Sequence, residues 1–341
     1  MKTDLKSLTL KELGQYLEKL GEKKFRAKQL FGWVYKGVES FDEMTDLSKE
    51  LRRKLDENAE IKKLKIITVQ NSEKDGTRKY LFGLEDGNSI ESVFMKYKFG
   101  NTVCISSQAG CRMGCSFCAS AINGLQRNLT AGEMADQIIS IEKDTGEKIS
   151  NIVIMGTGEP FDNYDNLTRF IENIHEKDGL YIGMRSITVS TCGLIPKMLE
   201  FAKDFPQVNL AISLHAPNDG IRNKLMPISK RYSMDELLKA CSQHIAMTGR
   251  RITFEYALIK DMNDSDRNAD ELAGKLRGIN CHVNLIPLNR VAETGLSGTE
   301  RADAEHFREH LEKRGVQVTI RRELGSDIDA ACGQLRLKNN W

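Results

Sequence analysis

The sequence predicts an α/β fold in which a parallel sheet closes as a barrel, or part of one, after a small helical domain. Helical periodicity fills the first 65 residues, short strands separated by turns follow, and apolar strands then alternate with amphipathic helices. Such alternation is typical of parallel sheets, whose functional residues gather at the carboxyl ends of the strands. The 341 residues, 40% of them hydrophobic, suffice for one large domain and a smaller one.

Residues 1–65 are predicted to form the small helical domain. Thr9 and Glu12 have the spacing of a capping box at the start of a first helix. Two more helices are expected, one around Leu30 and one around Leu51. The segment holds 16 Lys and Arg against 12 Asp and Glu, which a solvated face explains as well as contact with nucleic acid does.

Residues 66–101 are predicted to be an antiparallel connector, and residues 102–341 the barrel domain. Turns such as Asp75-Gly76 separate the short strands of the connector. Strands are expected at residues 66–70, 78–83, 89–96, 102–106, 151–155, 186–190, 209–214, 252–257 and 282–287, with an extra C-terminal strand at 316–321. Helices are expected between them at residues 130–144, 166–177, 195–203, 234–247 and 264–276.

Charge and cysteine content point to a cytoplasmic protein with no membrane partner. Charged residues make up 29% of the chain but nearly balance, at a net charge of +2, so global charge does not demand a nucleic-acid partner. The first residues lack the apolar stretch of a signal peptide, and no apolar run is long enough to cross a bilayer. Eight irregularly spaced cysteines do not look like a secreted disulfide framework, so they are expected as thiols for metal binding or catalysis.

Three cysteines, Cys111, Cys115 and Cys118, share one short loop with the spacing C-x3-C-x2-C. Three thiolates suit an iron–sulfur cubane, [4Fe-4S], that keeps one iron without a protein ligand. The alternative is a structural zinc site with Cys104 or a histidine as the fourth ligand. Such sites favour paired C-x2-C knuckles, and the sequence offers no second pair.

The segment Gly-Thr-Gly-Glu-Pro at residues 156–160 follows a predicted strand. Its glycines, Gly158 among them, would let a ligand approach the backbone, and the Glu159 carboxylate can accept hydrogen bonds from an ammonium group. An ordinary tight turn explains the segment equally well. It is not a dinucleotide fingerprint, because Phe161 stands where a third glycine would be needed.

Small polar groups also end three other predicted strands. They are Ser190, the segment Ser213-Leu214-His215, and Asn289. Any one of them is an ordinary strand end whose polar side chain satisfies local backbone groups. Together they would line one barrel mouth with hydrogen-bonding groups suited to a nucleoside and an amino acid.

Two cysteines outside the loop are candidates for chemistry. Cys104 lies seven residues before the loop, and Cys332 lies near the chain end in a stretch of small, Gly and Asp residues. A loop there would let a thiol reach over the barrel mouth and act as a nucleophile. Cys192, Cys241 and Cys281 are expected to be inert small hydrophobes.

His306 and His310 formally match the H-x-x-E-H pattern of a metalloprotease family. The pattern is rejected, because Phe307 and Leu311 define the buried stripe of the helix that carries it. The histidines are expected to be ordinary residues of the helix surface.

Motifs spaced over essentially the whole chain resemble the RlmN and Cfr family of radical S-adenosylmethionine (SAM) RNA methyltransferases. They lie at residues 104–110, 126–130, 158–160, 213–219, 282–287 and 331–335. The resemblance implies a partial (β/α)6 barrel of the TIM type with a [4Fe-4S] cluster. The implied metal ligands are Cys111, Cys115 and Cys118, and the implied SAM-binding residues are Gly158, Glu159, Ser190, Ser213, Leu214, His215 and Asn289.

The resemblance also implies a two-stage reaction at adenine C2, an electron-poor carbon that a radical can methylate but an ordinary SAM displacement cannot. In the family, one SAM methylates the cysteine matching Cys332, and a radical from a second SAM removes hydrogen from that methyl group. The resulting methylene adds to C2, and the residue matching Glu91 accepts the C2 proton. The thiol matching Cys104 then attacks the sulfur of Cys332 and releases the product as a disulfide forms. Without the resemblance, Glu91 would be read as an exposed strand carboxylate.

The implied partners are 23S rRNA, tRNA and an electron donor of the flavodoxin or ferredoxin type. Basic residues become candidate phosphate contacts, with aromatic neighbours for stacking. They are Lys96, Lys98, Arg222, Lys224, Lys230, Arg231, Arg321 and Arg322, with Tyr97 and Phe99 beside the first two. Three alternatives stay open: a Cfr-like adenine C8 methyltransferase that confers antibiotic resistance, a non-catalytic iron–sulfur RNA-binding protein, and a radical SAM enzyme acting on a peptide or metabolite.

Overall fold

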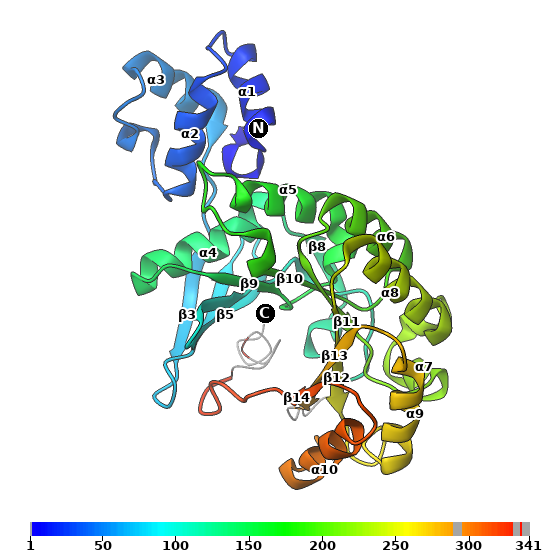
Figure 1. Cartoon of the computed structure of the whole chain (residues 1–341). Helices are drawn as coiled ribbons and strands as arrows, with labels where there is room; N and C mark the ends of the chain where they lie inside the picture. The colour runs from blue at the N-terminus through cyan, green and yellow to red at the C-terminus, as the bar shows by residue number, and fades with distance from the viewer. Residues whose placement is uncertain (1, 289–294, 330–334, 336–341) are drawn as a thin grey trace.

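The computed structural model describes residues 2–288, 295–329 and 335. Its centre is a ten-stranded sheet with the order β14-β13-β12-β11-β10-β9-β6-β5-β4-β3 (Figure 1). The strands are β3 (Lys65–Asn71), β4 (Arg78–Gly83), β5 (Ser89–Tyr97), β6 (Gly100–Cys104), β9 (Asn151–Ile154), β10 (Ile187–Thr191), β11 (Asn209–Ser213), β12 (Ile252–Leu258), β13 (Cys281–Pro287) and β14 (Val318–Ile320). Every neighbouring pair from β6 to β14 is parallel, so the predicted α/β fold with a barrel-type parallel sheet is confirmed.

The predicted connector strands continue this same sheet. β3, β4 and β5 pair antiparallel with one another, and β5 pairs antiparallel with β6 in a register that sets Val93 opposite Cys104. Residues of equal parity on β5 therefore share one face with the side chain of Cys104. The boundary between connector and barrel at residues 101 and 102 stays a prediction. The face of β5 that carries Val93 nevertheless points to the interior of the barrel, as the Cys104 side chain does.

Helices cover the outer face of the curved sheet, and the described residues that follow β14 lie on its inner side (Figure 1). They are α4 (Ala131–Thr145), α5 (Tyr164–His175), α6 (Ile195–Asp204), α7 (Asp219–Leu225), α8 (Met234–Thr248), α9 (Asp266–Leu276) and α10 (Arg301–Glu312). Capping boxes begin α4, α8 and α9. Their apolar stripes pack against the sheet, whose central residues such as Ile212 and Phe254 are fully buried. None of the helices in the described ranges is long and apolar enough to span a membrane.

The N-terminal domain comprises α1 (Leu10–Lys19), α2 (Arg26–Tyr35) and α3 (Lys49–Asn58). The predicted capping box is present, because Glu12 N–H donates to Thr9 Oγ1 at 3.2 Å and Thr9 N–H donates to Glu12 Oε2 at 2.9 Å. A two-residue parallel pair, β1 (Thr3–Asp4) with β2 (Ala59–Glu60), closes the domain and was not predicted. Two residues are too few to produce a periodic pattern.

A buried ion pair fixes this domain to α4. The Lys6 ammonium, 1% exposed, contacts Asp136 and donates to the Lys62 carbonyl at 2.7 Å. The other Asp136 oxygen accepts from Leu64 N–H at 2.6 Å. The pair is therefore fully hydrogen-bonded on the carboxylate side, as a buried charge requires.

Replacing Asp136 with alanine is expected to lower the free energy of unfolding by about 3–5 kcal/mol, because it leaves a buried ammonium without its counter-ion. Urea unfolding of the two chains measures the difference. The exposed pair Lys143–Glu39 also joins α4 to the N-terminal domain, and Glu39→Gln should cost less than about 1 kcal/mol. Equal losses in both variants would contradict this assignment.

Candidate functional site

A cavity of about 640 Å³ opens at the carboxyl ends of the parallel strands, on the inner face of the sheet. Most of the residues predicted for the site line it. These are Cys104, Cys111, Cys115, Cys118, Gly158, Glu159, Ser190, Ser213 and His215. The topology explains the convergence, because the carboxyl ends of parallel strands meet at one edge.

The cysteine loop is held by a small antiparallel pair, β7 (Gln108–Gly110) with β8 (Leu125–Asn128). Gly110 adopts φ +76°, and a Cβ there would lie 2.0 Å from the Gly124 carbonyl oxygen, so only glycine fits. Within the loop, Cys118 N–H donates to the Cys115 carbonyl at 3.1 Å. The three sulfur atoms are thereby carried on one short, tethered segment that faces the cavity.

The donor set fits an iron–sulfur cluster, because three thiols carried on one loop line the same cavity. A structural zinc ion takes four protein ligands, most often from two paired C-x2-C knuckles, and this loop supplies three thiols. Burial raises the pKa of Cys111 to about 12 and raises that of Cys115 as well. A positively charged metal group would favour the thiolate forms that these shifts disfavour.

Gly156 and Gly158 are required by the protein's own packing. A Cβ on Gly156 would lie 2.7 Å from the Ile105 carbonyl oxygen, and one on Gly158 would lie 2.6 Å from Gln108 Cβ. Gly158 also adopts φ +109°. Close approach by a ligand stays a prediction, and both glycines line the cavity. The close neighbours that the structure shows belong to the segment before the cysteine loop.

Glu159 connects this segment to the end of β10. Its Oε2 accepts from Cys192 N–H at 2.8 Å, and its Oε1 accepts from Phe161 N–H at 3.1 Å. Burial raises the pKa of this carboxyl, and the hydrogen bonds partly oppose the shift. The role of Glu159 in binding an ammonium group stays a prediction.

His215 is fixed as a neutral ring at the cavity wall. Its Nδ1 accepts from Ala257 N–H at 2.9 Å, so the ring proton is on Nε2. The Phe117 ring meets it edge-on, with centroids 4.8 Å apart. Burial, reinforced by the charge of Arg222, lowers the pKa of His215 to about 3. The backbone at His215 is left-handed, with φ +55°.

His215→Asn is expected to flatten the pH dependence of stability in acid. Below about pH 6.5 the unfolded chain binds a proton that the buried ring does not accept until about pH 3. As the pH is lowered through that window, the free energy of unfolding should therefore fall by up to ~1.4 kcal/mol per pH unit because of this group. Asparagine keeps an acceptor and tolerates positive φ. Urea unfolding of both chains, prepared alike at pH 7 and pH 5, measures the slopes, and equal slopes would refute the assignment.

Two predicted residues have side chains that do not line the cavity. Leu214 is buried in the core, and its carbonyl oxygen accepts from Arg222 Nε at 3.3 Å. Glu91 is 3% exposed and forms an ion pair with Lys79 at 2.8 Å, so its reading as an exposed strand carboxylate is wrong. It lies on the same face of β5 as Val93, which does line the cavity.

The prediction that Arg222 contacts phosphate is wrong, because this residue is only 1% exposed. Its guanidinium donates to the Cys192 carbonyl at 2.8 Å and to the Ser213 carbonyl at 3.4 Å. It therefore joins the ends of β10 and β11 beneath the cavity. Asn289 and Cys332 lie outside the described residues.

Sequence reasoning missed Glu255 of β12, which lines the cavity and is 5% exposed. Asn284 Nδ2 donates to its Oε2 at 2.8 Å, and burial raises the pKa of the carboxyl. The sequence did contain a signal for Glu255, since this acidic residue interrupts a strand expected to be buried on both faces. Cys192, predicted to be inert, also lines the cavity.

The segment before Cys332 forms one wall of the cavity. The residues that line it are 321–326, Ile328 and Asp329. Leu324 packs with Val93 and Met95 beside Cys104, which is 4% exposed.

Hydrogen bonds anchor this wall to the β3–β4 hairpin. Asp327 accepts from Ser72 Oγ at 2.6 Å, Gly325 N–H donates to Asp75 Oδ2 at 2.8 Å, and Asp329 N–H donates to Gln70 Oε1 at 2.9 Å. A side-chain hydrogen bond from Ser72 lowers the pKa of Asp327. These contacts hold the described end of the segment at the cavity.

Comparison with known proteins identifies both parts of the chain. Residues 3–61 match the family model of the ribosomal RNA large subunit methyltransferase N-terminal domain, and residues 105–273 match that of the radical SAM superfamily. The chain is 55% identical over 98% of its length to a probable dual-specificity RNA methyltransferase RlmN from Desulforamulus reducens, covering 96% of that protein. A protein of the same name from Alkaliphilus oremlandii is 56% identical, with 99% of this chain and 98% of that one covered.

A solved structure agrees with the sequence comparison. A radical SAM methyltransferase from Sphaerobacter thermophilus superposes with a TM-score of 0.92 at 45% identity, covering 97% of this chain and 98% of that one. Fold, cysteine loop and relatives over nearly the full length lead to one conclusion: the chain belongs to the RlmN family of RNA methyltransferases within the radical SAM superfamily.

Proposed function

We propose that this enzyme methylates C2 of adenosine in 23S rRNA and in tRNA through a methyl group carried on Cys332. One observation supports the proposal most: the cysteine loop, Cys104 and the segment that leads to Cys332 border a single cavity. An ordinary SAM methyltransferase needs neither the loop nor two further thiols at the same site. The near full-length similarity to proteins named dual-specificity RNA methyltransferases supports the choice of RNA as the substrate.

Cys111, Cys115 and Cys118 would hold a [4Fe-4S] cluster, and SAM would lie against the neighbouring strand ends. The two groups together supply a radical able to remove hydrogen from an unactivated methyl group. Gly158, Glu159, Ser190 and Ser213 border the place proposed for SAM, with His215 Nε2–H as a donor and the Glu255 carboxylate as an acceptor. Asn289, which lies outside the described residues, is proposed as a SAM-binding residue from the sequence alone.

The protein's own groups would handle the carbon and the proton. Cys332 would present the carbon at the cavity, and Cys104, which packs beside Leu324, would attack the Cys332 sulfur to release the product. A transient disulfide between these two cysteines follows from that step. Glu91 would accept the C2 proton from its position beside Val93, held in its ion pair by Lys79.

An aromatic pair next to the cavity offers a stacking surface for RNA. Tyr97 lines the cavity, and the Phe99 ring stacks on it with centroids 4.8 Å apart and planes 11° apart. Phe99 is 73% exposed and Lys98 is adjacent. A base beside an extruded adenosine could stack on the free face of Phe99, while Arg321 and Arg322 at the cavity wall contact phosphate.

Phe99→Leu is expected to raise the KM for RNA about fivefold to a hundredfold with kcat nearly unchanged. Loss of one base–aromatic stack costs about 1–3 kcal/mol, and each 1.4 kcal/mol is about tenfold in affinity. Steady-state kinetics with an RNA fragment measures the effect. Phe99→Tyr keeps the ring and should behave as the parent chain, whereas equal kinetics for all three chains would remove Phe99 from the RNA site.

Anaerobic reconstitution with iron, sulfide and methyl-labelled SAM tests the proposed reaction. Label should enter Cys332 first and adenine later, and mass analysis of the nucleosides should place it at C2. Label at C8 would establish the Cfr-like alternative, and RNA binding without any transfer would establish the non-catalytic one. An electron donor of the flavodoxin or ferredoxin type and action in the cytoplasm, where both RNAs are found, complete the proposal.

A further inference from the structure

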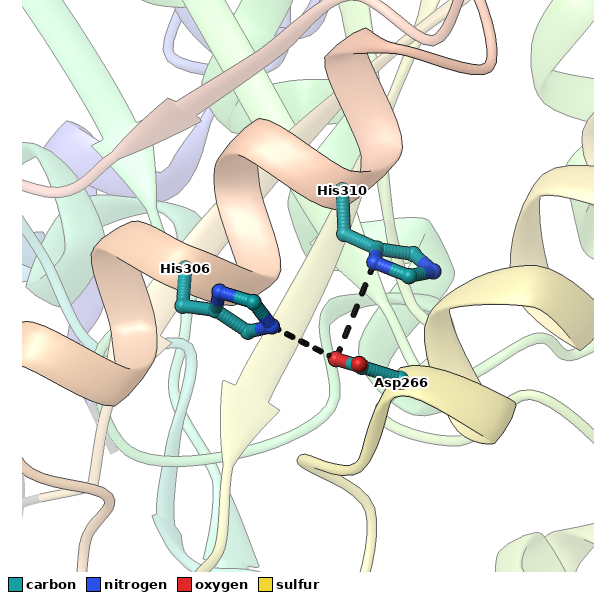
Figure 2. A group of neighbouring side chains, drawn as sticks. All are labelled: Asp266, His306 and His310. Atoms are coloured by element: carbon teal, nitrogen blue, oxygen red, sulfur yellow. Dashed lines mark hydrogen bonds and ion pairs between the residues drawn. The ribbon is translucent and has the colours of Figure 1, made fainter.

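Two histidines of α10 and one aspartate of α9 converge on the outer surface of the protein, outside the residues that line the cavity (Figure 2). The ligand atoms of His306, His310 and Asp266 all lie within 4.8 Å of one another. From the sequence we expected ordinary surface histidines, because the sequence does not show that α9 packs against α10. The spacing of four residues puts both rings on one face of α10.

The atoms facing one another are those that bind metals. His306 Nε2 lies 2.8 Å from Asp266 Oδ1, and His310 Nδ1 lies 3.7 Å from the same oxygen. Figure 2 shows both rings turned toward this carboxylate from one side. Without a metal, a proton occupies the short contact between His306 and Asp266, and a cation would take its place.

Two more residues prepare His310 for this role. Asp270, one turn after Asp266, accepts from His310 Nε2 at 3.0 Å, which places the ring proton on Nε2 and leaves the Nδ1 lone pair directed at Asp266. Arg314 forms an ion pair with Asp270. A carboxylate on the far nitrogen of a metal-binding histidine is the usual arrangement, because it fixes the tautomer and raises the basicity of the ligand.

We propose that His306, His310 and Asp266 bind one divalent ion of the zinc class, with water completing the coordination. Two imidazoles and one carboxylate suit zinc, cobalt, nickel or copper, whereas magnesium and calcium prefer oxygen ligands alone. A tetrahedral ion with bonds of about 2.0–2.2 Å holds its ligand atoms roughly 3.4 Å apart. The contact of 2.8 Å would therefore open and that of 3.7 Å would close, each by less than about 1 Å, and the exposed His306 and Asp266 side chains can move this far by rotation. The site is separate from the cysteine loop and independent of the proposed RNA chemistry.

The bound ion would join the last two helices of the barrel. α10 lies between β13 and β14, and β14 leads into the segment that forms the cavity wall. A metal that binds the folded chain and not the unfolded one stabilises it by mass action. Binding should therefore raise the melting temperature of the protein.

The test compares the full-length, cluster-loaded chain with a His306→Gln/His310→Gln variant under anaerobic conditions. Each is dialysed against micromolar zinc chloride, and the zinc retained per chain is measured together with the melting temperature. Zinc that binds to the cysteine loop is common to both chains and cancels. The parent should retain one more zinc ion than the variant, with a higher melting temperature in zinc and no change in magnesium.

Three further variants sharpen the result. Asp266→Asn should weaken zinc binding at least about tenfold, and Asp270→Asn should weaken it about 10- to 100-fold by acting through His310. His282→Gln, at a histidine on β13 that bonds Thr319, should have no effect. Equal zinc retention by the parent and the double variant, or an equal loss in His282→Gln, would overturn the site and leave a cluster of surface ion pairs.

Discussion

Replacing Cys332 with alanine is expected to abolish methylation of RNA and the transfer of any methyl group to protein. The proposed reaction passes its carbon through this sulfur. Of the described thiols at the cavity, Cys104 is assigned to product release, Cys111, Cys115 and Cys118 to the cluster, and Cys192, which is buried, has no role in the proposed reaction. Turnover should fall below detection. Iron content and RNA affinity should be unchanged, because the residue takes part in neither.

The measurement pairs labelled SAM with separate counting of protein-bound and RNA-bound label. Cys281→Ala is the matched control, since Cys281 begins β13 at the opposite end of the strand from the cavity. It should methylate RNA as the parent does. If the Cys332 variant still methylates RNA, the proposed carrier is wrong, and if RNA-dependent function persists with no methylation in either chain, the non-catalytic alternative is correct.

Local patterns predicted the parts of the site that are contiguous in the sequence. Cys111, Cys115 and Cys118 lie on one loop, so their spacing alone predicted that they act together. The meeting of Ser190 and Ser213 at the cavity follows from the rule that parallel strands have their carboxyl ends at the same edge of the sheet. Periodicity was sufficient for the order of the strands in the ten-stranded sheet, because each buried stripe there is long enough to read. It missed the short elements β1, β2, β7, β8 and α7.

The missing parts depend on contacts between distant segments. Glu91 was read as exposed because its partner Lys79 lies on another strand, and Arg222 was read as a phosphate contact because its acceptors are carbonyl groups at the ends of β10 and β11. The wall formed by residues 321–329 depends on hydrogen bonds to the β3–β4 hairpin, some 250 positions away in the chain. Contacts between distant segments produce no periodic pattern in the sequence. The local sign of such a contact is a charged residue within an apolar strand, as at Glu255.

Cys104→Ala is expected to stop the reaction one step later than Cys332→Ala, with protein and RNA covalently joined. In the proposed sequence a carbon links the Cys332 sulfur to adenine C2 before release. Attack by the Cys104 sulfur forms a bond between the two sulfurs and breaks the bond from Cys332 to that carbon, which stays on the RNA. Alanine cannot attack, so the link should persist.

The surroundings of Cys104 support its proposed role in this step. It ends β6 at the cavity, 4% exposed, and packs beside Leu324 of the segment that leads to Cys332. Denaturing gels should reveal a protein band that carries RNA, and nuclease digestion followed by mass analysis should find adenosine attached to the Cys332 peptide. Free methylated adenosine should be absent.

The pair of variants separates two roles that activity alone cannot distinguish. Both lose product, but only Cys104→Ala should accumulate a covalent adduct, and the double variant Cys104→Ala/Cys332→Ala should not, since the carbon is never loaded. An adduct in the double variant would place the link on another residue. Normal product release by Cys104→Ala would mean that a different nucleophile reaches the Cys332 sulfur, and Cys192, which also lines the cavity, would be the next thiol to replace.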